Sequence, residues 1–399
     1  MVGGSKVWRR RLRVAVCGLL AAGCGLAAGA EETKGKNMEK LLSCPPSVFA
    51  VGEEYQVCAL VDAECTMWVE VAGENYYDHS NGILRSGRFL HIAHVPLKEL
   101  ERAKGYTLHL QRLNERKPYF TDYGEVESST YAFRPVRAKA AFRVVNLADA
   151  HNTVAGPIGS GSFFGDKLDI LILNGDIPNH SGDINYFKAI YQIAGGITRG
   201  EIPCVFSRGN HDMRGIYAEQ LADYTPTDNG RSYFTFRLGP VWGIVLDAGE
   251  DKADGSEEYG RTICCSAFRR EEEAFLDRVI KEGDYKTAKI RLVVSHHPFA
   301  HRIHPPFDIE QELYARWCRK LKKIRPTVWL TGHLHECFQE EPGGAHDTYG
   351  YPCTLVCSSR VRVEKDGAER HVSGAVTIHG DGRVETAFID QDGQPWSGW

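Results

Sequence analysis

The chain has 399 residues, which suggests two or three domains of roughly 150 residues each. Apolar residues make up 42% and charged residues 25%, with 41 Gly and 17 Pro, and these near-average values exclude a disordered, collagen-like or coiled-coil protein. Five Lys and Arg but no acidic residue lie in the first thirty positions, so acidic groups exceed basic ones in the rest of the chain and nucleic acid is not an expected partner.

The first thirty residues have the order of a secretory signal peptide. A basic segment, 6–13, precedes an apolar stretch, 14–30, that is rich in Ala and Gly and ends in Ala28-Gly29-Ala30. This stretch is shorter and less apolar than the roughly 20 residues of a membrane span. We therefore expect cleavage after Ala30, a linker over 31–45 and an exported, periplasmic or extracellular protein. Two alternatives stay open: the apolar stretch is retained as an anchor, or Cys24 is lipidated, because Leu20 to Cys24 resembles a degenerate bacterial lipobox.

Ten cysteines follow the predicted signal peptide. Export permits disulfides, but the sequence does not say which cysteines would pair. Most of them lie in apolar, strand-like segments, as Cys204 and Cys357 do. We therefore expect most of them to be small buried side chains rather than members of a disulfide framework.

Residues 46–135 alternate between apolar and polar positions in short runs, such as 55–61, 67–71 and 106–111, with turn signals such as Asn81-Gly82 between them. Short alternating strands at this spacing predict an all-β sandwich. The segments 90–97 and 105–110 resemble later strands of the fibronectin-like module that precedes the catalytic domain of purple acid phosphatases. No cluster of site-like residues supports a carbohydrate-binding role for this module.

A different pattern begins after the basic linker at 134–140. Apolar runs at 142–147, 168–173, 202–206, 290–294 and 327–330 alternate with helical segments at 186–193, 216–224, 268–281 and 309–324. Buried strands alternating with amphipathic helices predict an α/β domain over residues 140–399, whose tail, 351–389, reads as strands with a turn at Gly380-Asp381-Gly382. In the helix over 268–281, the charged run 269–273 is expected to face solvent and Phe268, Phe275 and Leu276 to point inward.

Five polar motifs each follow an apolar run closely. They are Asp149-Ala150-His151, Gly175-Asp176, Gly209-Asn210-His211-Asp212, His296-His297-Pro298 and Gly332-His333-Leu334-His335. Ligands of α/β sheets collect at the carboxyl ends of the strands, so we expect these motifs to converge. Imidazoles mixed with oxygen donors suit Zn, Mn or Fe, and Asp176 is the natural carboxylate to bridge two such ions.

In this order, the five motifs resemble the calcineurin-like metallophosphoesterase superfamily, whose pattern is D-x-H, G-D, G-N-H-[DE], H and G-H-x-H. The resemblance spans about 142–335 and implies an α/β (α+β) fold, a β-sandwich flanked by helices, with two metal ions as cofactors. It implies one metal held by Asp149, His151 and His335, a second held by Asn210, His296 and His333, and Asp176 shared between them.

The resemblance also implies that His211 is the general acid and that Asp212 orients it. One departure concerns the purple acid phosphatases, which place a metal-binding tyrosine where Asn179 stands here and which lack the histidine present here as His151. A tyrosinate–iron centre is therefore not expected. His180 and Arg214 are candidates for contact with a substrate, and Arg208 is expected to brace its loop.

A binuclear centre of this kind predicts an exported phosphoric ester hydrolase, a phosphatase or phosphodiesterase acting on a small phosphate ester. Metal-bridged hydroxide would attack phosphorus while His211 gives a proton to the leaving alkoxide. The alternative is a non-catalytic, metal-containing surface protein that binds a partner or glycan through the N-terminal sandwich. The complete ligand set together with His211 favours the enzyme.

Overall fold

The computed structural model describes residues 41–363 and 367–396. The predicted signal peptide, its cleavage site and Cys24 lie outside the described residues, so export and lipidation stay predictions.

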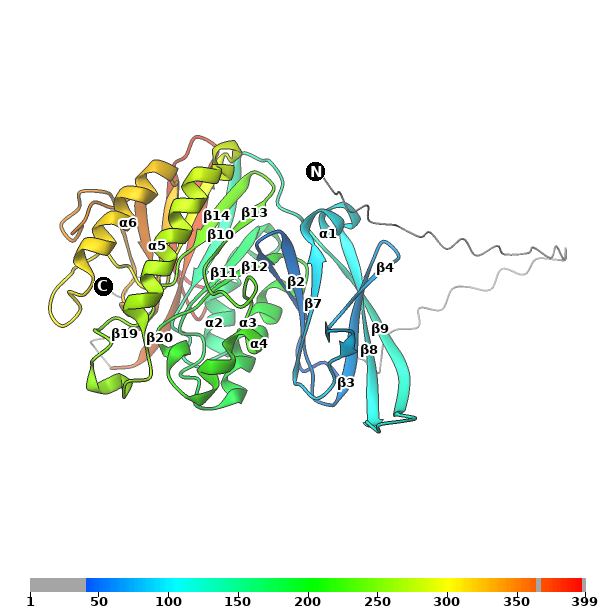
Figure 1. The fold of residues 1–399 in the computed structure, drawn as a ribbon. Coiled ribbons are helices and arrows are strands. Elements are labelled where there is room, and N and C mark those ends of the chain that lie inside the picture. Colours follow the sequence, from blue (N-terminus) through cyan, green and yellow to red (C-terminus); the bar gives the residue numbers. More distant parts are fainter. Residues whose placement is uncertain (1–40, 364–366, 397–399) are drawn as a thin grey trace, which may run out of the picture. The chain divides into compact units, whose positions relative to one another are not determined.

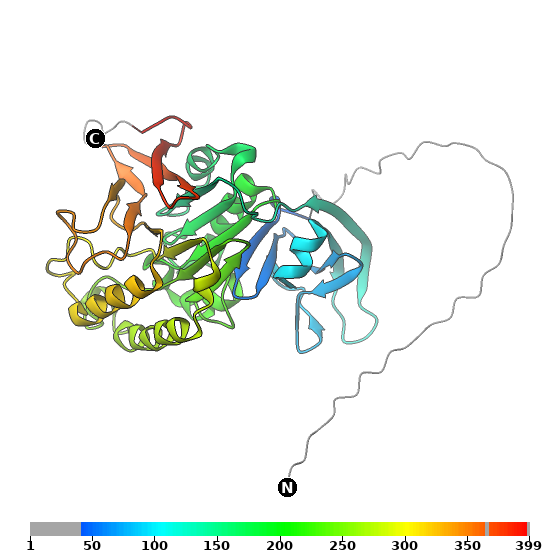
Figure 2. The same ribbon diagram turned by 90° about the horizontal axis from the view of Figure 1, so that it is seen from above.

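Two sheets form the body of the C-terminal region (Figures 1 and 2). The first sheet runs in the order β19 (Arg360–Arg362), β20 (Glu369–His379), β10 (Ala141–Leu147), β11 (Ile170–Asn174), β12 (Pro203–Ser207), β1 (Ser47–Val51), β2 (Glu54–Leu60) and β7 (Leu90–Pro96), with β21 (Val384–Asp390) on β20. The second runs in the order β13 (Phe234–Leu238), β14 (Val241–Val245), β15 (Ile290–Val294), β16 (Val328–Thr331), β18 (Thr354–Cys357) and β17 (Phe338–Glu340).

The strands that matter for the site run parallel within each sheet. In the first sheet β10, β11 and β12 are parallel neighbours, and in the second β14, β15, β16 and β18 are. Their carboxyl ends therefore lie along one edge of each sheet. The five strands predicted from apolar runs all form, each within two residues of its predicted ends.

Helices cover the outer faces of the two sheets. In the second sheet, β14 turns Val241 and Val245 toward the core between the sheets, whereas Trp242 and Ile244 face the helices. Helices α5 (Cys265–Glu282) and α6 (Gln311–Ile324) lie side by side on that outer face (Figures 1 and 2). Helices α2 (Ala155–Gly161) and α3 (Lys188–Thr198) contact the first sheet. The resulting helix–sheet–sheet–helix layering confirms the predicted fold class.

The helices differ from the prediction in detail. The predicted segment 216–224 divides into a 3₁₀ segment, Ile216–Gln220, and the short α4 (Leu221–Tyr224). Helices α1 (Leu97–Ala103) and α2 and strands β13 and β14 were not predicted. Helix α2 is hard to predict because its glycines are poor helix formers, but a Cβ at Gly159 would lie 2.0 Å from the Gln391 carbonyl oxygen, so only glycine allows this close packing.

The charged run at 269–273 in α5 corrects one prediction. Arg269 and Glu272 are buried instead of facing solvent. The Arg269 guanidinium donates to the carbonyl oxygens of Ala248 and Glu250, and the Glu272 carboxylate accepts from the Asp247 N–H. Both side chains therefore fix the loop after β14, although Glu272 Oε1 is buried without a hydrogen-bond partner.

The N-terminal β region shares a sheet with the rest of the chain. Strand β1 pairs in parallel with β12, while β4 (Glu74–Tyr77), β3 (Cys65–Val71), β8 (Gly105–Glu115) and β9 (Asp122–Ala132) form a separate four-stranded sheet. A two-stranded ribbon joins β5 (His79–Ser80) and β6 (Ile83–Leu84). Residues 35–399 belong to one compact unit, so the domain limits near residues 46, 135 and 140 stay predictions.

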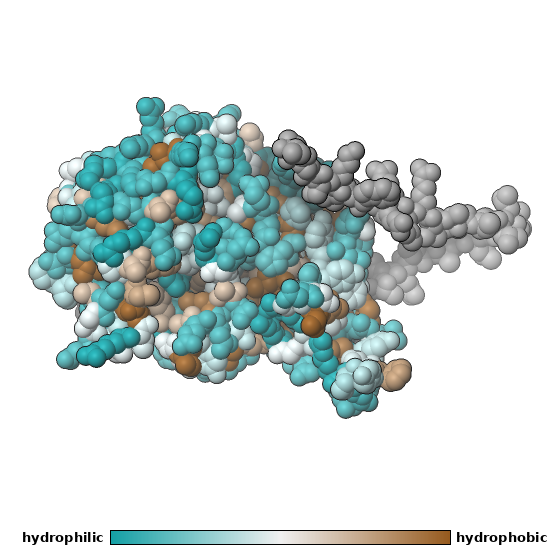
Figure 3. Space-filling view, in the orientation of Figure 1, coloured by the Kyte–Doolittle hydropathy of each residue, from teal (hydrophilic) through white to brown (hydrophobic). Residues whose placement is uncertain are grey.

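Most of the described cysteines are buried, whereas some large hydrophobic side chains, such as Tyr119 and Phe120, are exposed. All ten described cysteines are unpaired, and eight of them are buried, whereas Cys44 is half-buried and Cys264 exposed. Figure 3 shows a mostly hydrophilic face with hydrophobic residues in small separate groups. Within the described ranges, no helix has the length and apolar character needed to cross a bilayer.

Candidate metal centre

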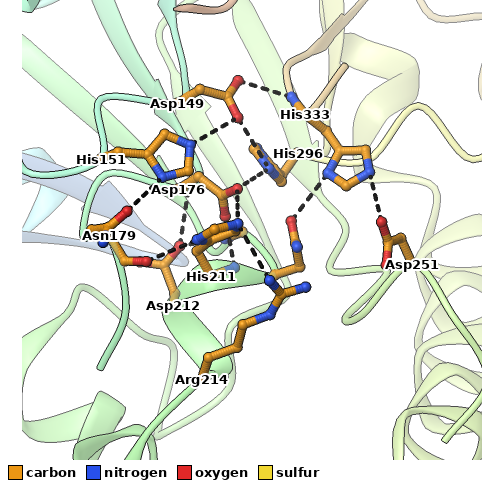
Figure 4. Close-up of polar contacts among 12 residues, drawn as sticks. Asp149, His151, Asp176, Asn179, His211, Asp212, Arg214, Asp251, His296 and His333 are labelled. Carbon is orange, nitrogen blue, oxygen red and sulfur yellow. Dashed lines mark hydrogen bonds and ion pairs between the residues drawn. The ribbon is translucent and has the colours of Figure 1, made fainter. Parts of the chain in front are cut away.

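The predicted motif residues meet at the carboxyl ends of the parallel strands (Figure 4). Asp149, Asp176 and Asn210 follow β10, β11 and β12 in the first sheet, while His296 follows β15 and His333 and His335 follow β16 in the second. Ligand-type atoms of these residues fall into three overlapping groups, within each of which all the atoms lie within 4.8 Å of one another. The groups are Asp149–His151–His335, His151–Asp176–His211 and Asp176–His296–His333.

A buried polar bridge holds the two sheets together beneath the centre. The side-chain amide of Asn146 on β10 donates to the Thr331 carbonyl oxygen on β16 and to the Ser358 hydroxyl, both at 2.8 Å. Asn174 on β11 donates to the Asn146 side-chain oxygen at 3.0 Å. Because each of these groups is buried and hydrogen-bonded, they fix the strand ends with little freedom.

The backbone of the centre is unusual as well. Asp149, His151, Asp176, His333 and His335 all have positive φ, between 43° and 75°. Side chains other than glycine rarely adopt this region, and it concentrates at functional sites. The motif glycines are required by close approach, since a Cβ at Gly209 would lie 2.1 Å from Asp176 Oδ1.

Asp149 has one carboxylate oxygen anchored and one free. Oδ2 accepts hydrogen bonds from the backbone N–H of His333 at 2.9 Å and from the Ser359 hydroxyl at 2.6 Å. Oδ1 is buried without a hydrogen-bond partner and lies 3.8, 3.8 and 3.7 Å from the Nε2 atoms of His151, His296 and His335. These separations are too long for hydrogen bonds and leave room for a cation among the four atoms.

Asp176 and His296 form the most strongly charged contact of the centre. Asp176 Oδ2 lies 3.1 Å from His296 Nε2, while its Oδ1 accepts from the His211 backbone N–H at 2.8 Å. Burial would raise the pKa of Asp176, but the attraction of His296 outweighs it and holds that pKa well below the usual range. Burial likewise opposes a proton on His296, yet Asp176 and Asp149 raise its pKa to about 10. The negative charge that holds a proton here would equally hold a metal cation.

Asn210 and His333 approach each other from the two sheets. The Asn210 side-chain oxygen lies 3.0 Å from His333 Nδ1. With the amide turned over, its nitrogen would donate to His333 Nδ1 and to Asp176 Oδ2, at 3.0 and 3.2 Å. A cation between these acceptors would instead favour the amide oxygen toward them. His333 Nε2 lies 3.4 Å from Asp251 Oδ2, and this contact leaves Nδ1 as the nitrogen toward Asn210.

His211 lies beside the metal-ligating candidates with one ring nitrogen fixed. Its Nδ1 donates to the Asn179 carbonyl oxygen at 2.8 Å, and its Nε2 is 4.0 Å from Asp176 Oδ2. Asp212, predicted to orient this ring, instead accepts from the backbone N–H groups of Asp176 and Gly209 at 2.9 and 2.7 Å. Asp212 thus braces two loops and the Asn179 carbonyl contacts the ring, while a role of Asp212 in orienting His211 stays a prediction.

The buried position of Asp212 also affects its protonation. Burial first, and then the charge of Asp176, raise the pKa of Asp212 to about 7. Its two backbone donors oppose this shift, because they stabilise the carboxylate.

The other residues considered in the sequence divide between the centre and its surroundings. The Arg214 guanidinium binds Glu250 through two hydrogen bonds, at 2.7 and 2.8 Å, and its Nη1 lies 3.4 Å from His211 Nε2. Arg208 is 2.5 Å from Asp247 Oδ2 and therefore braces its loop. His180 accepts from the Gly182 backbone N–H at 3.0 Å, a local turn contact that does not involve the centre.

Asn179, the departure from the purple acid phosphatases, supports the first motif. Its side-chain oxygen lies 3.2 Å from His151 Nδ1, so Nδ1 carries the proton and Nε2 is left as the lone-pair nitrogen. That Nε2 is buried and has no hydrogen-bond partner. Burial lowers the pKa of His151 to about 4, which keeps the ring neutral as a metal ligand requires.

These observations fit a pair of metal ions. The donor set mixes carboxylate, amide and imidazole groups, which suits Zn, Mn or Fe. Asp149 Oδ1 and His151 Nε2 are buried without hydrogen-bond partners, a cost that a bound cation would remove. Asp176 groups with His151 on one side and with His296 and His333 on the other, as expected of a ligand shared by both ions.

Sequence reasoning missed Asp251 and Ser359. Asp251 contacts His333, and Ser359 contacts Asp149. The signal for Asp251 was the same as for the five motifs, since acids follow the apolar run 241–246, but that run was not predicted as a strand. Ser359 carries no signal of its own, because a single serine after a strand is common.

Comparison with known proteins agrees with this fold and centre. Residues 142–337 match the calcineurin-like phosphoesterase family. A purple acid phosphatase from yellow lupin (Lupinus luteus) seeds has a similar structure, with a TM-score of 0.56 and 13% identity over 88% of this chain and 72% of the lupin chain. The structure of PhoD is similar with a TM-score of 0.52 and 13% identity over 90% of this chain and 93% of its own. No curated protein matches by sequence.

Residues 142–337 therefore form a calcineurin-like phosphoesterase domain, a class of metal-dependent phosphoesterases. The resemblance stated from the five motifs is thereby confirmed.

Proposed function

We propose that this chain is an exported hydrolase of small phosphate esters that works with two metal ions. The observation that carries the proposal is the unpartnered Asp149 Oδ1, which lies 3.7–3.8 Å from three imidazole nitrogens. Asp149, His151 and His335 would hold one ion, Asn210, His296 and His333 the other, and Asp176 both. When bound, such a pair supplies Lewis acidity toward a phosphoryl group and lets water act as a nucleophile at neutral pH.

His211 is proposed as the proton donor to the leaving oxygen. Its Nδ1–H is held by the Asn179 carbonyl oxygen, so Nε2 is the nitrogen that gains and loses the catalytic proton. The side chain is 30% exposed, which leaves room for a leaving group to approach. A positioned acid of this kind contributes about 10²- to 10⁴-fold to the rate.

Arg214 is proposed to orient the phosphoryl group next to His211. Its guanidinium lies 3.4 Å from His211 Nε2 and keeps a 26% exposed side chain. The bidentate pair with Glu250 fixes the plane of the guanidinium. Glu250 thereby offsets the positive charge of Arg214 beside His211.

The test is hydrolysis of p-nitrophenyl phosphate and bis(p-nitrophenyl) phosphate by protein loaded with zinc or manganese. We expect Asn210→Ala to abolish turnover and His211→Ala to lower kcat by about 10²- to 10⁴-fold. His304→Ala, at an exposed histidine outside the three groups, is the matched control and should leave turnover unchanged. A metal-loaded wild type that hydrolyses no ester in a broad panel would favour the non-catalytic alternative.

Export is supported by the sequence alone, through the basic segment 6–13 and the apolar stretch 14–30. Mass spectrometry of the protein from the periplasm or medium should find a chain that begins at residue 31. A chain that begins with a lipidated Cys24 would establish the lipoprotein alternative, an intact amino terminus would contradict cleavage, and absence of the protein from both fractions would contradict export.

A further inference from the structure

A second cluster of metal-ligand side chains lies away from the centre. It consists of His301, Glu340 and His346, whose ligand atoms all lie within 4.8 Å of one another. The three residues line a cavity of about 490 Å³, and His335 of the metal centre lines the same cavity. Among the described residues this is the one such group that contains no member of the five motifs.

The spacing within this cluster is that of a metal site. Glu340 Oε2 lies 3.3 Å from His301 Nδ1, and Glu340 Oε1 lies 3.2 Å from His346 Nδ1. Ligands at about 2.0–2.2 Å from a tetrahedral zinc ion stand roughly 3.3 Å apart. The Tyr351 hydroxyl is 2.6 Å from His301 Nδ1 and 3.0 Å from Glu340 Oε2, so a fourth donor is close by.

The surrounding backbone holds the cluster in place. The Arg302 N–H donates to the His346 carbonyl oxygen at 2.9 Å, which ties the two loops together. A Cβ at Gly344 would lie 2.5 Å from Glu340 Oε1, so the carboxylate sits in a space that only glycine leaves open. His301 is 4% exposed, its ring stacks on Phe338 at 4.5 Å, and its Nε2 is buried without a hydrogen-bond partner.

A purely hydrogen-bonded network is the competing account. The contacts of Glu340 with His346 and Tyr351 satisfy both carboxylate oxygens. Such a network explains the short distances, and it leaves His301 Nε2 buried without a hydrogen-bond partner, which has a cost; metal held at Nδ1 leaves the same nitrogen unpartnered, so metal content has to distinguish the two accounts. A metal ion bound to one nitrogen of His301 would leave the other nitrogen protonated and without an acceptor. The free energy of metal binding would offset the cost of burying that nitrogen.

We propose that His301, Glu340 and His346 bind a further divalent metal ion of the zinc class, separate from the pair at the centre. Two imidazoles and one carboxylate are a zinc ligand set that leaves a coordination position open. Because His335 lines the same cavity, an anionic group bound to this ion would lie beside the phosphoesterase centre.

The test is the number of zinc ions bound per chain, measured by inductively coupled plasma mass spectrometry after equilibration with excess zinc and desalting. We expect His346→Ala to bind one ion fewer than the wild type, since its side chain is 42% exposed and its loss should not disturb folding. Glu340→Gln, which keeps the shape of the side chain, should also bind one ion fewer. His304→Ala, at a nearby exposed histidine, should bind as many as the wild type.

Two further results separate this proposal from that of the centre. Asp176→Asn should lose metal at the centre, and adding His346→Ala to it should remove one more ion. The proposal is overturned if His346→Ala and Glu340→Gln, folded by circular dichroism, bind as many zinc ions as the wild type. It stands on metal content alone, so failure of the hydrolysis assay would not affect it.

Discussion

The two halves of the metal centre are built differently. The ligands proposed for one ion are called the first group from here on, and those proposed for the other ion, Asn210, His296 and His333, the second group. Both rings of the second group have a fixed partner, since His296 donates to the Asn174 carbonyl oxygen at 2.6 Å and His333 contacts Asp251 at 3.4 Å. In the first group (Asp149, His151 and His335) the His151 ring also has a partner, the Asn179 side-chain oxygen 3.2 Å from its Nδ1, but Asp149 Oδ1 and His151 Nε2 have no hydrogen-bond partner. The His335 side chain is 42% exposed, against 3% for His296.

This difference indicates that the second group is preorganised and the first depends on its metal. Ligands whose orientation is fixed by outer contacts bind more tightly, because less freedom is lost on binding. We therefore expect the ion at the first group to exchange faster and the ion at the second group to remain longer. The faster-exchanging side also borders the cavity that His335 lines.

The largest loss of activity is expected from a change at Asp176, which both groups share. Asp176→Asn removes the charge shared by both groups, so kcat/KM for p-nitrophenyl phosphate should fall by at least about 10³-fold. Metal content should fall with it. Activity within tenfold of the wild type, with two ions still bound at the centre, would break the account of Asp176 as a shared ligand.

Chelation should separate the two halves in time. Zinc release from loaded His346→Ala protein, which lacks the further site, into a colorimetric chelator should follow two phases, with rates at least about tenfold apart. His335→Ala should accelerate or remove the fast phase and leave the slow one. If His335→Ala changes only the slow phase, the assignment of the looser ion to the first group is wrong.

The residues that hold the ligand histidines from outside, Asp251 and Asn179, give a matched pair of variants. Asp251→Asn should weaken metal binding at the second group by about 10- to 100-fold, because His333 loses the carboxylate that orients it. Asn179→Ala should do the same at the first group through His151. Titration of metal-free protein, monitored by calorimetry, measures both, and equal effects of each variant on both ions would remove the distinction between the halves.

The smallest effect concerns a salt bridge outside both halves. Glu273 on α5 bonds Arg316 and Lys320 on α6, at 2.8 to 3.0 Å. Glu273→Gln should lower stability by about 0.5–1 kcal/mol at pH 7 and leave metal release unchanged. It thereby controls for a general loss of stability in the chelation experiment.

The same salt bridge predicts a pH dependence. The hydrogen bond to Arg316, with Lys320, lowers the pKa of Glu273 from 4.5 to about 2. Since the folded pKa is depressed, its stabilisation is complete above pH 4.5 or so and is lost as the pH falls toward 2. The difference in melting temperature between wild type and Glu273→Gln should therefore shrink over this range, and a difference that grows on acidification would contradict the assignment.

Much of the fold and most of the centre follow from the sequence. Buried parallel strands are apolar along most of their length, so β10, β15 and β16 stand out, and motifs at their ends are expected to converge. Helix α2 is glycine-rich because of close packing against Gln391, which no local pattern records. The role of Asp212 depends on which backbone N–H groups lie against it in the folded chain. The burial of Arg269 depends on the loop after β14, whose Ala248 carbonyl oxygen it binds. The spacing of residue types along the sequence does not predict such long-range contacts.

Anomalous diffraction from crystals of zinc-loaded protein tests the central claim most directly. The account predicts two strong peaks at the strand ends, one on each side of the Asp176 carboxylate, with His335 beside one and Asn210 beside the other. A single peak, or none, among these residues in fully loaded protein would contradict it.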